Sequence, residues 1–253
     1  LLPFYTFLFI DCLYVPMKTD RALKQKAVYV ILGYDINGEK DILGIWINET
    51  EGKHTWMQIF DEIKNRGVQD IGFISMDGVS GLEEGAAAIF PGTVVQRCIV
   101  HLIRNSMRYI PWNKSREFLK ELKEIYKATN VAEARRLFEK FKGKWAAYPG
   151  AIAVWKNNFQ HVEQLFNYGS NVRRVMYTTN AIESINSSFR KVTRKGSFAN
   201  DEAILKLLYL RVLELKNTKW KGKGKVFNWQ AVMNQLLIDE RMSKLIAKYD
   251  WLI

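Results

Sequence analysis

The chain has 253 residues, of which 48% are hydrophobic and 13% aromatic, and this content excludes an intrinsically disordered protein. No apolar run approaches the ~18 residues that a membrane-spanning helix needs, so we expect no membrane partner. The formal net charge is +12, from 38 Lys and Arg against 26 Asp and Glu, and such an excess favours a polyanionic partner. Because the chain has only two cysteines, Cys12 and Cys98, we expect a reducing compartment and no disulfide framework.

The first third of the chain carries strand patterns. Residues 5–14 are apolar at both odd and even positions, which predicts a central strand that is covered on both faces. Residues 27–34 and 41–48 flank Asn37-Gly38, a strong hairpin signal. The next predicted elements are a helix at 54–66, a strand at 70–76, a helix at 81–90 and a strand at 94–98. The order β-β-β-α-β-α-β predicts an α/β fold with a mixed sheet and helices on both sides.

The rest of the chain is predicted to be helical. Within residues 99–168 the helical patterns cover 117–126, 132–145 and 151–166, and no strand pattern interrupts them. Further helices are predicted at 178–194, 201–215 and 229–248, and a flexible basic loop at 219–225. We therefore expect an all-helical insertion between the sheet and the helix at 178–194.

Two aspartates occupy positions where ligands gather. Asp11 interrupts the predicted central strand, where a charge is costly unless it is paired or bound to a metal ion. Asp77 follows the strand at 70–76, and the carboxyl ends of strands are common ligand sites in α/β sheets. The alternatives are an acid at the exposed end of a strand for Asp11 and a simple Asp-Gly turn for Asp77.

The helix at 178–194 reads TTNAIESINSSFRKVTR and begins with a single acid. Helical spacing places Glu183, Asn186, Arg190 and Arg194 along one face, an arrangement that suits a metal ion beside a phosphate backbone. The alternative is a capping box in which Asn180 is the N-cap and Glu183 its partner. The basic excess of the chain is concentrated just downstream, with eleven Lys or Arg against three acids between residues 184 and 225.

These residues lie in stretches that resemble the Mutator-type insertion-sequence transposases of bacteria, a group of DDE transposases. The matching stretches are FLFIDCLYV, KAVYVILGYDINGEKDILGIW, DGVSGL, FPGTVVQRCIVHLIRNS, RRVMYTTNAIESINSSFRKVTRKGSF and LKLLYL. The resemblance implies an RNase H-like catalytic domain in which Asp11, Asp77 and Glu183 are the catalytic triad. It also implies that these carboxylates bind two Mg²⁺ ions, or Mn²⁺ in their place, for phosphoryl transfer.

The resemblance implies roles for neighbouring residues as well. Arg190, Arg194 and Lys195 would bind DNA, although the two arginines could equally pair with nearby acids. Asn186 would support the site. The family carries a CxxH signature after its second Asp, which points to Cys98 and His101 as a further supporting element. A zinc site is not expected there, because a tetrahedral site needs four ligands and the remaining thiol and imidazole groups are not suitably paired.

Aromatic residues of the predicted insertion have two interpretations. Trp145, Trp155 and Phe159 could stack on an unpaired base at a transposon end, as aromatics of the insertion do in some related transposases. Core packing is the favoured alternative.

The predicted organisation has three parts: the first part of an RNase H-like core at 1–110, the helical insertion at 111–172, and the helix of Glu183 with the C-terminal helices at 173–253. The chain looks like a fragment that lacks an N-terminal DNA-recognition region. We expect a DNA transposase that nicks transposon ends and transfers strands by 3′-OH attack, as a homo-oligomer on DNA in the bacterial cytoplasm at the nucleoid. The alternatives are a non-catalytic DNA-binding or assembly remnant, and an RNase H-like nuclease without strand transfer.

Overall fold

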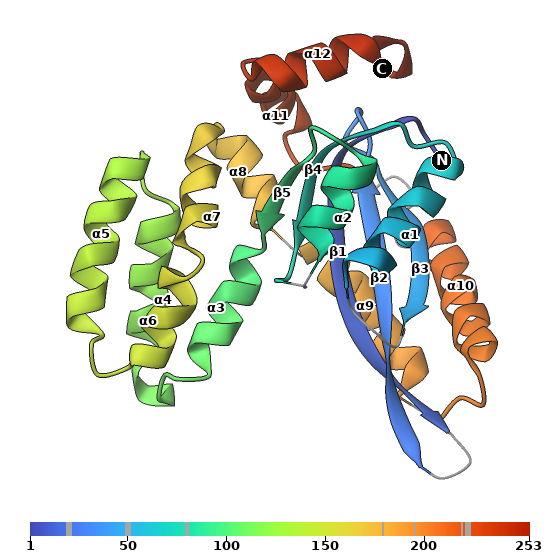
Figure 1. The fold of residues 1–253 in the computed structure, drawn as a ribbon, viewed down its shortest axis with the longest axis horizontal. Coiled ribbons are helices and arrows are strands. Elements are labelled where there is room, and N and C mark those ends of the chain that lie inside the picture. The colour runs from blue at the N-terminus through green and yellow to red at the C-terminus, as the bar shows by residue number, and fades with distance from the viewer. Residues whose placement is uncertain are drawn as a thin grey trace. The chain divides into compact units, whose positions relative to one another are not determined.

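The computed structural model describes residues 1–18, 22–48, 52–78, 81–178, 180–194, 196–218, 220 and 224–253. The chain folds into two compact units. The first unit comprises Leu1–Val95 and Thr178–Ile253, and the second comprises Gln96–Tyr177. The elements of both units are labelled in Figure 1. The predicted domain boundaries at residues 110 and 172 stay a prediction.

A five-stranded mixed sheet forms the centre of the first unit. Its strands are β1 (Phe4–Lys18), β2 (Leu23–Tyr34), β3 (Lys40–Asn48), β4 (Asp70–Met76) and β5 (Val94–Arg97). The order across the sheet is β3-β2-β1-β4-β5, with β1 antiparallel to β2, β2 antiparallel to β3, and β1 parallel to β4. The predicted α/β fold and element order are confirmed. β1 and β2 are longer than predicted, because their pairing continues as an arm to the pair Lys18↔Leu23.

Helices cover both faces of the sheet, which explains why β1 is apolar at both odd and even positions. On one face lie α1 (Lys53–Asn65) and α2 (Leu82–Ile89), and Tyr29 of the sheet meets Trp56 of α1 at 5.1 Å between ring centroids. α9 (Asn180–Thr193) lies behind the sheet in Figure 1, and α10 (Asp201–Asn217) lies beside β3 and packs on α9 and β3. Burying each such large apolar side chain contributes about 1.5–3 kcal/mol to folding.

The C-terminal segment forms two helices rather than one. The predicted helix at 229–248 is wrong, since α11 (Trp229–Leu236) and α12 (Glu240–Lys248) are separate. The break occurs because the Asp239 side chain accepts a hydrogen bond from the Met242 amide at 2.8 Å and so caps α12. Directly after α12, the Tyr249 ring stacks on the Phe4 ring of β1, with 5.1 Å between the ring centroids.

The second unit is helical except for the end of β5. Its α-helices are α3 (Ile99–Met107), α4 (Trp112–Tyr126), α5 (Val131–Lys144), α6 (Pro149–Lys156), α7 (Phe159–Gln164) and α8 (Ser170–Met176). The predicted single helix at 151–166 is wrong, because the chain breaks between α6 and α7. There the Asn158 side chain donates to the Val154 carbonyl at 2.8 Å and satisfies an end group of α6. Pro149 is the first residue of α6, a position where its missing N–H costs no hydrogen bond.

In the described ranges, no helix combines the length and the apolar character that crossing a membrane requires.

Candidate active site

Asp11 lies on β1, and Asp77 directly follows the neighbouring strand β4. The parallel register of β1 and β4 ends with the pair Ile10↔Met76, and each aspartate is the next residue of the chain after its member of that pair. β4 ends at Met76, whereas β1 continues to Lys18. From Asp11 onward, β1 therefore no longer pairs with β4. Both aspartates are half-buried. The pairing of β1 with β4 therefore brings two carboxylates that are distant in sequence to the same level, at the C-terminal end of β4.

α9 contributes a side chain to the Asp11 carboxylate. Asn186 is fully buried, and its Nδ2 donates to Asp11 Oδ2 at 2.6 Å. The other oxygen, Asp11 Oδ1, accepts from the Cys12 amide at 2.9 Å. The Asn186 Oδ1 atom is buried and has no hydrogen-bond partner within the described residues. Asn186 therefore holds one orientation of Asp11 and presents an unsatisfied acceptor beside it.

The local sequence explains how α9 reaches the sheet. Ile182, Ile185 and Phe189 are buried on its apolar side, and α9 packs on β1. Glu183 precedes Asn186 by three residues, a spacing that puts the two Cβ atoms about 5–6 Å apart on one face of a helix. Glu183 is half-buried and thus lies one turn from the residue that binds Asp11.

The capping alternative for Glu183 requires Asn180 to be the residue immediately before α9. In the structure α9 begins at Asn180 itself. Asn180 is therefore a helical residue rather than the residue before the helix.

The donor chemistry of the site fits a hard divalent cation, because aspartate and glutamate supply the oxygen ligands that Mg²⁺ prefers. The unsatisfied Oδ1 of Asn186 adds an oxygen acceptor at the same place. Across the described parts of the chain, however, no three His, Cys, Asp or Glu side chains are grouped so that they could hold one ion. Asp11 and Asp77 are thus neighbours, and Glu183 does not form a three-carboxylate cluster with them in this conformation.

The predicted DNA-binding residues differ in placement. Arg190 lies on α9 and Arg194 directly follows its last residue, and both side chains are exposed. Lys195 lies outside the described residues. Another basic residue of this region, Arg211 of α10, donates to Ser188 Oγ at 2.8 Å and pairs with Glu214. Arg190 and Arg194 therefore point to solvent, whereas Arg211 joins α10 to α9.

Cys98 and His101 belong to the second unit. Cys98 is buried at the N-cap position of α3, and His101 is half-buried in the first turn of the same helix. Their role as a supporting element stays a prediction.

The aromatic residues proposed for base stacking are packed inside the second unit. Trp145 is 3% exposed and donates to Glu121 at 2.9 Å, and Trp155 is fully buried and donates to Ser106 at 3.1 Å. Phe159 stacks on Phe138 at 4.3 Å between centroids. Core packing is therefore the role of these side chains in this structure.

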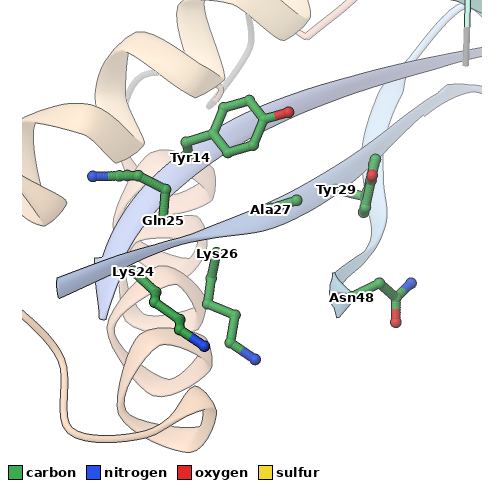
Figure 2. A pocket seen from close by; sticks show the side chains of 7 residues that line it. All are labelled: Tyr14, Lys24, Gln25, Lys26, Ala27, Tyr29 and Asn48. Carbon is green, nitrogen blue, oxygen red and sulfur yellow. The ribbon is translucent and has the colours of Figure 1, made fainter. Parts of the chain in front are cut away.

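A polar hollow that sequence reasoning missed lies on the β1–β2 arm. Figure 2 shows its lining side chains, which include the Tyr14 ring and the ammonium groups of Lys24 and Lys26. Its volume is about 450 Å³, and Tyr14 is 63% exposed. None of the proposed catalytic residues lines it. We place the candidate site at the carboxylates rather than here, because the acids that could hold a metal ion lie there and none of them lines this hollow.

Comparisons with known proteins find sequences similar to this chain. The family model described as "Transposase, Mutator family" matches residues 1–222. A transposase for insertion sequence element ISRM3 from Rhizobium meliloti (strain 1021) is 41% identical over 220 residues, which cover 86% of this chain and 55% of that protein. A probable ISRM3-like transposase from Sinorhizobium fredii (strain NBRC 101917 / NGR234) is 40% identical with the same coverage.

A third relative, a probable transposase for an insertion sequence element from Corynebacterium diphtheriae, is 34% identical over 254 residues, which cover 93% of this chain and 74% of that protein. The chain thus spans about half the length of the first two relatives. Because the family model covers most of the sequence, the chain belongs to the Mutator family of transposases.

Proposed function

We propose that this chain is the catalytic domain of a DNA transposase that nicks transposon ends and then transfers strands by 3′-OH attack. The observation that carries the proposal is the meeting of Asp11, at the end of the β1–β4 register, with Asn186 of α9. This contact brings the helix of Glu183 to the strand ends where Asp11 and Asp77 lie. The relatives' names, which describe transposases of insertion sequence elements, support the same activity.

The proposed fold of the first unit is RNase H-like. Three features support it: the strand order β3-β2-β1-β4-β5, the antiparallel pairing of the first three strands, and the parallel pairing of β1 with β4. In this arrangement the first acid lies on the central strand, the second directly after its parallel neighbour and the third on a later helix. That placement explains why residues so distant in sequence would work together.

Asp11, Asp77 and Glu183 are the residues that would hold two Mg²⁺ ions, or Mn²⁺. When bound, such ions lower the pKa of bound water and neutralise charge on the phosphoryl group. The chain's own contribution is to orient the carboxylates, and Asn186 does this for Asp11 through its bond of 2.6 Å. Glu183 would complete the ligand set from one turn away on the same helix.

Arg190 and Arg194 would bind phosphate groups of the DNA backbone near the site. Both are exposed, and the planar guanidinium group donates in a fork that matches phosphate oxygens. The net charge of +12 supports DNA as the partner, since a polyanion is attracted by such an excess.

The test is the Asp77→Asn variant of the full-length protein. We expect Mg²⁺-dependent nicking of a supercoiled plasmid carrying transposon ends to fall to background, while DNA binding is retained, because the amide loses the negative charge of a metal ligand. Nicking at the native rate by a folded Asp77→Asn variant would remove Asp77 from the mechanism.

A second candidate is a non-catalytic DNA-binding or assembly module. The observation that favours it is the lack of a three-carboxylate group among the described residues. It predicts salt-dependent DNA binding by the native full-length protein without nicking in Mg²⁺ or Mn²⁺. Hydrolysis products without strand-transfer products would instead indicate an RNase H-like nuclease.

A further inference from the structure

β1 and β2 stay paired with each other after both have lost their outer neighbours. β4 last pairs with β1 at Ile10, and β3 last pairs with β2 at Ala27. β1 and β2 continue as far as the pair Lys18↔Leu23. Residues 14–18 and 23–27 make up this β1–β2 arm, and Figure 1 shows the two strands running past the ends of the others. Since an isolated pair of strands is barely stable in water, the arm needs contacts on at least one face.

The two faces of the arm differ in exposure. Val15 and Met17 are 0% and 9% exposed, and Met17 also forms a parallel bridge with Phe198 of the segment that follows α9. Successive side chains of a strand point to opposite faces, so the intervening residues of β1 share the other face with their partners on β2. That face carries four exposed side chains: Tyr14, Lys18, Leu23 and Gln25. The arm therefore has one covered face and one open face.

The arm is basic. Beyond Asp11, neither β1 nor β2 contains an Asp or Glu, whereas the arm contains Lys18, Lys24 and Lys26. Lys26 Nζ lies 3.9 Å from Asp201 Oδ1, so part of its charge is compensated. Lys18 and Lys24 are exposed. These two lysines are therefore the main cations that the arm presents to a partner.

The polar hollow described above lies on the arm, beside the last residue of β3. In Figure 2 the Gln25 side chain lies on one side of the β2 ribbon, and the Lys24 and Lys26 side chains lie on the opposite side. The Tyr14 ring lines the same hollow, and none of the described lining residues is an acid. Because phenol, amide and ammonium groups all donate hydrogen bonds to phosphate oxygens, the hollow suits a phosphate backbone.

The arm continues the strand that carries Asp11. Tyr14 and Lys18 follow Asp11 by three and seven residues, so at about 3.3 Å per residue they lie roughly 10 and 23 Å farther along β1. A DNA duplex rises about 3.4 Å per base pair, so a duplex along the arm would place these residues roughly three to seven base pairs from a phosphodiester at Asp11. An acidic protein segment would also suit the lysines, but only DNA has to pass this place in the proposed reaction.

We propose that the β1–β2 arm binds the DNA that flanks the scissile phosphodiester, with Lys18 and Lys24 on its phosphate groups. Tyr14 and Gln25 face the groove between those phosphates, since a two-stranded β-ribbon fits the width of the major groove. The inference rests on the proposed function, which supplies both the DNA partner and the position of the scissile bond. The arm then holds the flanking duplex in line, and the carboxylates carry out the chemistry.

The first experiment measures DNA affinity against salt concentration without any divalent cation, so that catalysis plays no part. It compares the native full-length protein, Lys18→Ala/Lys24→Ala and a control, Lys120→Ala/Lys123→Ala, whose lysines are exposed on α4. The probe is a labelled duplex that carries a transposon end. We expect the slope of log K against log salt concentration to fall by about 2 in the arm variant and by less than about 1 in the control. Circular dichroism melting checks that each variant is folded.

The two ways in which this experiment can fail are distinguishable. If the native protein does not bind the duplex, the DNA partner of the proposed function is lost and the arm proposal with it. If the native protein binds and the arm variant keeps the native slope, the arm proposal alone is overturned. The carboxylate site is then unaffected, and an acidic protein segment becomes the partner to test on the arm.

The second experiment locates the contact along the DNA. Uncharged methylphosphonate linkages replace phosphates roughly three to seven base pairs from the junction of the transposon end, on one side or the other, or in a control window farther away. On one side, the near window should weaken binding by the native protein roughly 10-fold. The same window should weaken binding by Lys18→Ala/Lys24→Ala much less, because the charges that would contact it are already gone. Equal losses for the two proteins would overturn the placement of the arm on flanking DNA.

Discussion

Asn186 is the residue on which the arrangement of the site depends most directly. It is fully buried, and it joins α9 to β1 through a bond across 175 residues of sequence. A buried amide that bonds a carboxylate limits the rotamers of that carboxylate, because any other orientation leaves both groups unsatisfied. The acceptor atom of the same amide, Oδ1, lacks a partner in the described residues, which is unusual for a buried atom and points to a ligand or water at that position.

We predict that Asn186→Ala lowers the rate of nicking by roughly 10–100-fold, the usual effect of losing a residue that orients a metal ligand. The Mg²⁺ concentration for half-maximal rate should rise as well, because Asp11 is no longer held in one orientation. Nicking kinetics over a Mg²⁺ series measure both effects.

The control for that experiment is Ser184→Ala, at an exposed position of α9 on the other side of the helix. An Asn186→Ala protein that melts like the native protein and keeps its native Mg²⁺ requirement would contradict the positioning role.

At the scale of elements, the β2–β3 hairpin and the C-terminal helices form one packed assembly. Gly38 in the turn has φ 75°, a left-handed conformation that favours glycine. The Trp229 ring of α11 lies directly over it, and Trp229 Nε1 donates to the Ile36 carbonyl at 2.9 Å. The Asn-Gly turn that the sequence predicts thus serves a second purpose, since the absent side chain leaves room for a tryptophan from nearly 200 residues later.

We predict that Gly38→Ala destabilises the protein by roughly 1–3 kcal/mol more than Gly92→Ala, as measured by chemical denaturation. Both glycines have positive φ, 75° and 91°, so both variants carry backbone strain. Only the Cβ at position 38 would overlap the Trp229 ring, whereas nothing lies within 4 Å of a Cβ at position 92. Equal losses of stability would show that α11 does not pack tightly on the turn.

At the scale of the whole molecule, the net charge of +12 is the property that most affects a polyanionic partner. Some of the basic residues are already paired with acids: Arg135 is bound to Glu163 and Arg136 to Glu133, each through two hydrogen bonds. Arg190 and Arg194 are exposed at the C-terminal end of α9, the helix that carries Glu183. The two pairs of arginines should therefore contribute unequally to DNA binding.

We predict that the double variant Arg190→Ala/Arg194→Ala weakens binding to duplex DNA and reduces the slope of log K against log salt concentration by about 2, because each lost phosphate contact reduces the slope by about 1. Fluorescence anisotropy over a salt series measures this slope. The matched control is Arg135→Ala/Arg136→Ala, for which the slope should change by less than about 1. The prediction is wrong if the two double variants share the same slope.

The strand and helix order could be predicted from the sequence because its signals are local. The apolar run around Asp11 and the Asn37-Gly38 turn identify β1, β2 and β3 within a few residues of their ends. The missed boundaries had a local cause that periodicity does not register: Asp239 and Asn158 end or begin helices through hydrogen bonds of their side chains. Periodicity continued across both positions and so predicted helices that were too long.

The candidate site, too, could be predicted from the sequence only in part. The sequence determined which acids could act and that the chain belongs to a basic, α/β, transposase-like class, because residue type, spacing and family resemblance are all properties of the linear chain. Only the tertiary structure decided that Asn186 binds Asp11 and that Trp145 and Trp155 are core residues. The physical reason is that burial and long-range hydrogen bonds depend on how β1, α9 and α10 pack together, and that packing is a property of the whole fold.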